Sequence, residues 1–241
     1  MKQRMSSLRK TSLAAGVFYL LTFVSIPAPF ALYASVRGPN YILGSGPDTA
    51  VFVGAVLEMI VALAGIGTAI ALYPVIKKQG ESRALGLVAS RTLEAGIIFA
   101  GVATLLSVVA LRQAGAGAGA LFTSQALTAQ YTALFLVSQS FIPAVNAVLL
   151  GSLLYQSRLV PRALPMLGFV GATLLTAAWF ATLFGFIGAT SAAAAVGGLT
   201  IASWEFSLGV YLVVKGFRPS PITATMEDSN PAEVRSLKNA A

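Results

Sequence analysis

Six long apolar stretches, separated by short polar connections, dominate the sequence. They cover residues 12–35, 50–76, 84–111, 131–155, 163–188 and 192–214. Each is long enough for an α-helix that crosses the hydrocarbon core of a bilayer, which takes about 20 mainly apolar residues. The sequence lacks the repeated ten-residue segments of period two that are typical of outer-membrane barrels. The pattern therefore predicts an all-α fold, a polytopic integral membrane bundle of six transmembrane helices.

The positions of lysine and arginine predict the orientation of these helices. Four basic residues precede the first span, three lie between the second and third, two lie between the fourth and fifth, and four follow the sixth. The other connections hold only Arg37 and Arg112. Because short cytoplasmic loops carry the excess of positive charge, both termini are predicted to be cytoplasmic. A cleaved signal peptide is the alternative interpretation of the first span, but no small-x-small cleavage site follows it.

The domain organisation is predicted to be simple. Residues 1–218 form one membrane domain, and residues 219–241 form a tail with Pro, Ser, Thr and mixed charge. Such a composition cannot bury enough apolar surface to fold, so the tail is expected to be disordered and cytoplasmic. The low-complexity sequence AGAGAGA at 114–120 is expected to be a flexible loop tip on the outer side.

Composition supports the membrane assignment and excludes several kinds of chemistry. Hydrophobic residues make up 56% of the chain and charged residues 10%, a balance that a soluble surface cannot accommodate. Histidine and cysteine are absent, so disulfides, thiolate metal sites and imidazole catalysis are excluded. We expect no cofactor, no metal and no catalytic residues. The net charge of +8 matches the inner-face bias and predicts contact with anionic lipid at the cytoplasmic face, without a nucleic-acid partner.

Four ionisable residues lie inside the predicted spans, where insertion scales put the cost of a charge at about 2.5–3.5 kcal/mol. Glu58 lies either at the outer interface or in a polar site. Arg91 and Glu94 share one helical face, where they either form a structural ion pair near the inner interface or line a polar cavity. Glu205 lies near the middle of the last span, so it must be protonated, paired with a cation such as Arg91, or in contact with water.

The fourth span carries an uncharged polar stripe. Gln139, Pro143 and Asn146 are spaced by four and three residues and so share one face of a helix. Pro143 cannot donate a hydrogen bond to the carbonyl of Gln139, which predicts a kink at this point. Such interruptions line cavities in transporters, and they also occur as plain packing kinks.

Three short motifs resemble a known family. They are Leu72-Tyr73-Pro74 at the end of the second span, Arg91-x-x-Glu94-Ala95 in the third, and Glu205 followed by Lys215-Gly216-Phe217 in the sixth. In this order the chain resembles, from about residue 9 to 217, the bacterial multi-pass membrane proteins grouped as domain-of-unknown-function family 4386. The resemblance implies a bacterial integral membrane protein of the cell membrane and no particular activity, ligand or catalytic residue. It marks Arg91, Glu94 and Glu205 as positions that match the family pattern.

Three classes of function stay open. In the first, the chain is a small-solute or ion transporter, a channel or a membrane sensor, whose polar intramembrane site is drawn from Glu58, Arg91, Glu94, Gln139, Asn146 and Glu205. Three spans followed by three give two halves of opposite orientation, as an inverted repeat requires. In the second, it is a non-catalytic scaffold or partner subunit, as a homo-oligomer or with an unknown membrane partner, and its buried charges are structural. The third, a membrane enzyme, is disfavoured because a Ser-His pair is impossible and Asp48 and Asp228 lie outside the spans.

Overall fold

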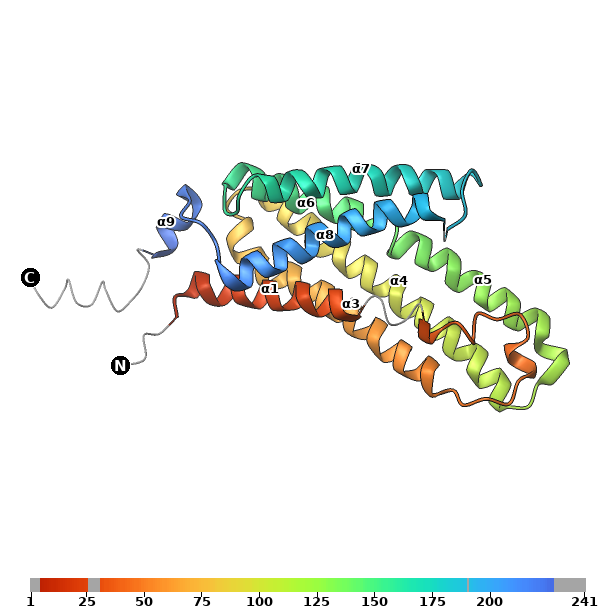
Figure 1. The fold of residues 1–241 in the computed structure, drawn as a ribbon. Helices are drawn as coiled ribbons and strands as arrows, with labels where there is room; N and C mark the ends of the chain where they lie inside the picture. Colours follow the sequence, from red (N-terminus) through yellow and green to blue (C-terminus); the bar gives the residue numbers. More distant parts are fainter. Residues whose placement is uncertain (1–4, 26–30, 190, 228–241) are drawn as a thin grey trace, which may run out of the picture.

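A computed structural model shows a bundle of long helices that run roughly along one axis (Figure 1). The structure describes residues 5–25, 31–189 and 191–227, and within these ranges it contains helices and no strand. The all-α prediction is therefore confirmed for the described residues. The long helices are α1 (Ser7–Ser25), α3 (Thr49–Ile76), α4 (Glu81–Gln113), α5 (Leu121–Ser138), α6 (Ile142–Ser157), α7 (Ala163–Leu183) and α8 (Ala192–Val214). Shorter elements are η1 (Tyr41–Leu43), η2 (Gly117–Ala120) and α9 (Pro221–Glu227).

Five segments of the described chain are long and apolar enough to cross a membrane. They are α3, α4, the segment Gly117–Ser157 that contains α5 and α6, α7 and α8. Their length and composition fit a multi-pass membrane protein. Helix α1 has 19 residues, with Arg9 and Lys10 near its start, and is not among the five. The predicted first span, 12–35, runs past the end of α1 into residues 26–30, which lie outside the described residues. Six spans and two cytoplasmic termini therefore stay a prediction.

The helix boundaries follow the apolar stretches closely, with two corrections. Helices α3 and α8 begin and end within one residue of the predicted spans. Helix α4 is longer than the predicted 84–111, because Glu81 lies in its first turn, where an acidic side chain is favourable, and the helix continues to Gln113. Helix α7 ends at Leu183 instead of 188. Gly185, with a φ of 75°, takes the left-handed conformation that ends helices.

The fourth predicted span differs most from the structure. Residues 121–130, which the sequence placed in a loop, are helical, so α5 begins ten residues before the predicted start at 131. The sequence 114–120, predicted to be a flexible loop tip, forms the short connection between α4 and α5 and contains η2. The predicted interruption is confirmed and is more than a kink: α5 stops at Ser138, and α6 begins at Ile142 with Pro143 in its first turn. A proline fits there because the first-turn N–H groups have no partner within the helix.

The helices pack in a closed order around the bundle. Helix α1 packs between α3 and α8, α3 packs on α4, α4 contacts both α5 and α6, α6 packs on α7, and α7 packs on α8. Glycine allows the closest approach, because a Cβ on Gly16 of α1 would lie 2.8 Å from the carbonyl oxygen of Gly209 on α8. Trp204, fully buried, packs in the same way against Gly168 of α7. Backbone contact through small residues is typical of membrane helix pairs.

The end of the bundle at which α1 begins and α8 ends is called the terminal end here. Arg9 donates hydrogen bonds to the carbonyl oxygens of Leu212 (3.0 Å) and Val213 (2.5 Å), which are unsatisfied groups at the end of α8. The hydroxyl of Ser220 donates to the carbonyl of Ser157 at 2.6 Å. Within the predicted tail, 219–241, Pro221–Glu227 forms α9, and residues 228–241 lie outside the described residues.

A polar cluster holds the opposite end together. Asp48, the residue before α3, forms an ion pair with Arg112 near the end of α4 and accepts hydrogen bonds from the Tyr41 hydroxyl and the Gln113 amide. Arg112 also donates to the carbonyl of Gly46 at 2.5 Å. Burial would by itself raise the pKa of Asp48, but the hydrogen bonds from Tyr41 and Gln113 and the Arg112 charge outweigh burial and lower this pKa below its ordinary value.

Candidate intramembrane polar site

Arg91 lies between two glutamates in the interior of the bundle. Its Nη1 is 3.0 Å from Oε2 of Glu94, one turn along α4, and its Nη2 is 2.5 Å from Oε1 of Glu205 on α8. Each of the three residues is at most 8% exposed. The spacing of three residues places Arg91 and Glu94 on one face of α4, as the sequence predicts. The tertiary structure adds Glu205 as a second partner, so the guanidinium is buried inside the bundle between two carboxylates.

Asn146 of α6 completes this cluster. Its Nδ2 donates a hydrogen bond of 2.8 Å to Oε2 of Glu94, the same oxygen that faces Arg91. The ring of Tyr19 on α1 lies 5.9 Å from Cζ of Arg91, within the range of a cation–π contact. Tyr19 is not among the site residues predicted from the sequence, although a tyrosine in the middle of an apolar helix needs a polar partner for its hydroxyl.

Glu58 belongs to a second, separate cluster. It is 2% exposed and accepts hydrogen bonds from the hydroxyls of Tyr131 (2.8 Å) and Tyr33 (3.3 Å) and from Nε2 of Gln139 (3.1 Å). The Glu58 carboxylate is therefore shielded from solvent by the protein, and its predicted place at the outer interface stays a prediction. All three of these donors are neutral, in contrast to the charged partner of Glu94. The predicted stripe is thus divided, because Gln139 binds Glu58 whereas Asn146 binds Glu94.

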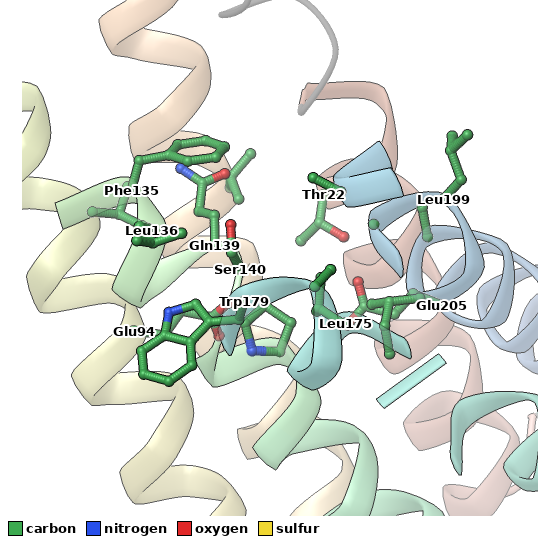
Figure 2. A pocket seen from close by; sticks show the side chains of 18 of the residues that line it. Thr22, Glu94, Phe135, Leu136, Gln139, Ser140, Leu175, Trp179, Leu199 and Glu205 are labelled. Carbon is green, nitrogen blue, oxygen red and sulfur yellow. The ribbon is translucent and has the colours of Figure 1, made fainter. Parts of the chain in front are cut away.

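A cavity of about 600 Å³ ends on the Arg91 cluster. Its walls come from α1, α3, α4, α7, α8 and the region where α5 breaks, and most lining residues are apolar. Figure 2 shows Phe135, Gln139 and Trp179 on one side of the cavity and Leu199 and Glu205 on the other. Arg91, Glu94, Glu205 and Gln139 supply polar groups to its surface, whereas Glu58 and Asn146 do not line it.

The cavity lies beside the break between α5 and α6. Helix α5 packs on α4, and α7 packs on α6 and α8, so the two sides separate beyond the break (Figure 1). Gln139, Ser140 and Pro143, all at the break, line the cavity. The cavity also reaches Ser191, in the connection between α7 and α8, and so extends from the buried ion pairs toward the end opposite the termini.

Residues 14–216 match the family described as "Domain of unknown function (DUF4386)". The chain belongs to this family. The match includes every residue of the Arg91 cluster and the Glu58 cluster and most of the chain from α1 to α8. No curated protein and no solved structure matches the chain.

The DUF4386 chain leaves several polar atoms of the site without partners. Within the described residues, hydrogen bonds use only Oε2 of Glu94 and Oε1 of Glu205. Both glutamates line the cavity, and within the described residues Oε1 of Glu94 and Oε2 of Glu205 accept no hydrogen bond. Arg91 Nε and Trp179 Nε1 are buried and have no hydrogen-bond partner in the described part of the chain.

The charges of this DUF4386 site do not balance by themselves. Two carboxylates share the single guanidinium of Arg91, so the cluster carries one excess negative charge when both glutamates are ionised. In a low-dielectric interior such an excess is costly unless a proton or another cation is bound. The site is therefore chemically suited to hold and release a cation or a proton.

Proposed function

We propose that this DUF4386 protein is a small-solute or ion transporter, or a membrane sensor built on the same machinery, and that the cavity bordered by Glu94 and Glu205 is its solute site. The observation that carries the proposal is that an otherwise apolar cavity ends on two carboxylates sharing one arginine. A purely structural ion pair would gain from being sealed away from solutes, because a low local dielectric strengthens it. Ionisable groups inside a membrane that border a cavity are typical of substrate and ion pathways.

The discontinuous α5–α6 segment supports this proposal. Transporters place solutes where a membrane helix is broken, because the break frees backbone groups and opens space beside the neighbouring helices. Here the break at 139–141 lies beside the cavity, and Gln139, Ser140 and Pro143 line it. The proline prevents the two helices from merging into one straight span.

The order of the helices also supports a transport mechanism. Helices α1, α3 and α4 pack consecutively, and so do α6, α7 and α8. Glu94 and Glu205 lie in the last helix of each series and meet at one arginine. This is the arrangement expected of two halves related by an inverted repeat, with the site at their interface. In the predicted orientation, both termini are cytoplasmic, anionic lipid surrounds the basic terminal end of a bacterial cell membrane, and the cavity faces outward.

The absence of native cysteine allows a direct test of access to the cavity. Ser140→Cys places a thiol on the cavity wall, whereas Ser138→Cys, two residues earlier, places it at a buried position that does not line the cavity. We expect a membrane-impermeant thiol reagent to label Cys at 140 much faster than Cys at 138, from one side of oriented vesicles only. Equal protection of both cysteines in folded variants would contradict a solute-accessible cavity.

The second candidate function is a scaffold or partner subunit with structural ion pairs. The observation in its favour is the burial of Arg91, Glu94 and Glu205 together with the short contacts between them. In this case Glu205→Gln lowers stability and changes no solute-dependent property. In a transporter or sensor, the same variant also alters the response to the solute.

A further inference from the structure

We propose that the cavity binds a lipophilic organic cation, such as an amine or a quaternary onium ion, with its charge beside Glu94 and Glu205 and its apolar body against the cavity walls. This inference rests on the proposed solute site and specifies the class of solute. Two features of the cavity carry it: the excess of negative charge at its end and the apolar, partly aromatic lining of the rest.

The charge at the end of the cavity selects for a cation. Glu94 and Glu205 both line the cavity, and each uses only one carboxylate oxygen to pair with Arg91. The second oxygen of each carboxylate is an acceptor without a donor in the described residues, and the cluster lacks one positive charge for neutrality when both glutamates are ionised. An onium group supplies the missing charge, and an N–H of an amine also supplies a donor. An anion would meet two carboxylates and only a guanidinium whose Nη atoms are already engaged.

The walls of the cavity select for an apolar body. Phe23 of α1, Phe135 of α5 and Trp179 of α7 line it, together with small and aliphatic residues of α3 and α8. Aromatic faces attract cations, most strongly where water is excluded. A volume of about 600 Å³ lies within the range of small-molecule sites. A hydrated metal ion would leave most of this apolar surface without a partner.

The test uses two probes of one shape and opposite charge. Tetraphenylphosphonium and tetraphenylborate are added to the purified full-length chain in lipid nanodiscs, with empty nanodiscs as the blank, and binding is measured by equilibrium dialysis. We expect the phosphonium to bind at least about tenfold more tightly than the borate, which corresponds to about 1.4 kcal/mol. Equal binding of both ions would mean an apolar cavity without charge selection, and it would overturn the proposal.

Single-residue variants test whether the phosphonium binds in the cavity. Glu205→Gln removes the excess charge and is expected to weaken phosphonium binding at least about tenfold, whereas Glu81→Gln, on an exposed side chain at the start of α4, leaves it unchanged. Gly198→Leu places a side chain into open space on the cavity wall and is expected to abolish binding. Gly96→Leu adds the same side chain on α4, away from the cavity, and is the matched control.

The outcomes separate this inference from the proposed function. Labelling of Cys at 140 without phosphonium binding would overturn the cation assignment and leave the solute site standing. Protection of Cys at 140 would contradict the solute site itself. Phosphonium binding that survives Gly198→Leu would place the ion elsewhere and overturn the proposal. If Glu205→Gln does not fold, the comparison of the two ions on the unaltered chain still decides the matter.

Discussion

Arg91 and Glu205 lie 114 residues apart in the sequence, yet Nη2 of the arginine and Oε1 of the glutamate are 2.5 Å apart inside the bundle. The pair joins α4 to α8, two helices that pack mainly on other partners. It therefore ties the last helix to the first half of the chain across the end of the cavity. Movement of α8 relative to α4 would have to break or rearrange this contact.

Among substitutions at the site, removal of the shared arginine should lower the stability of the fold most. Arg91→Leu leaves two buried carboxylates close together without a cation, and we expect the free energy of unfolding to fall by about 3–5 kcal/mol. Thermal unfolding in detergent, followed by circular dichroism, measures the effect. Arg83→Leu is the control, since Arg83 bonds only to Ser152 and Gln156 among the described residues and should cost about 1 kcal/mol or less. Equal destabilisation by the two variants would contradict a central role for Arg91.

Each tyrosine hydroxyl that donates to Glu58 should contribute to stability according to the length of its hydrogen bond. The hydrogen bond from Tyr131 is 2.8 Å and that from Tyr33 is 3.3 Å, so Tyr131→Phe should be the more destabilising of the two. We expect a loss of about 1–3 kcal/mol for Tyr131→Phe, because a buried carboxylate loses a donor. The melting temperatures of both variants give the order. A larger loss of stability for Tyr33→Phe than for Tyr131→Phe would contradict this order.

Arg9 should stabilise the end of α8. Its two hydrogen bonds satisfy carbonyl oxygens that have no partner within the helix, and its charge lies at the negative end of the helix dipole. Arg9→Ala is expected to cost about 1–2 kcal/mol of stability. Lys10→Ala, which removes an exposed charge at the next position, should have little effect. Hydrogen exchange near Leu212 and Val213 should increase in the first variant and not in the second.

The Asp48–Arg112 pair should make stability depend on pH at the acidic end of the range. Because the pKa of Asp48 is lowered in the folded chain, its contribution is present above the ordinary aspartate pKa and is lost as the pH falls through the lowered value. Asp48→Asn should therefore reduce the melting temperature at pH 7, and the difference from the unaltered chain should shrink toward pH 3. A constant difference across this range would show that Asp48 stabilises the protein in some other way.

Residue type and spacing alone determined the position of several helices, the break in the fourth span and one ion pair. The lengths of the apolar stretches place α3, α7 and α8 to within a few residues at most ends, because the hydrocarbon thickness dictates helix length. Pro143 predicts the interruption of the fourth span. Its ring clashes with the preceding helical turn, and its missing N–H removes a backbone hydrogen bond of the helix. The spacing of Arg91 and Glu94 predicts their pairing, because residues three apart share a helical face.

Contacts between helices were decided only by the tertiary structure. The length of an apolar stretch does not determine how its helix is rotated about the helix axis. That rotation is set by packing between neighbouring helices, such as the contact of Gly16 with Gly209. That rotation directs Gln139 to Glu58 and Asn146 to Glu94, although one stripe in the sequence carries both. The same packing brings Glu205 to Arg91 and opens the cavity beside them. Hydrophobic length thus determines which segments enter the membrane, and packing determines which of their polar groups meet.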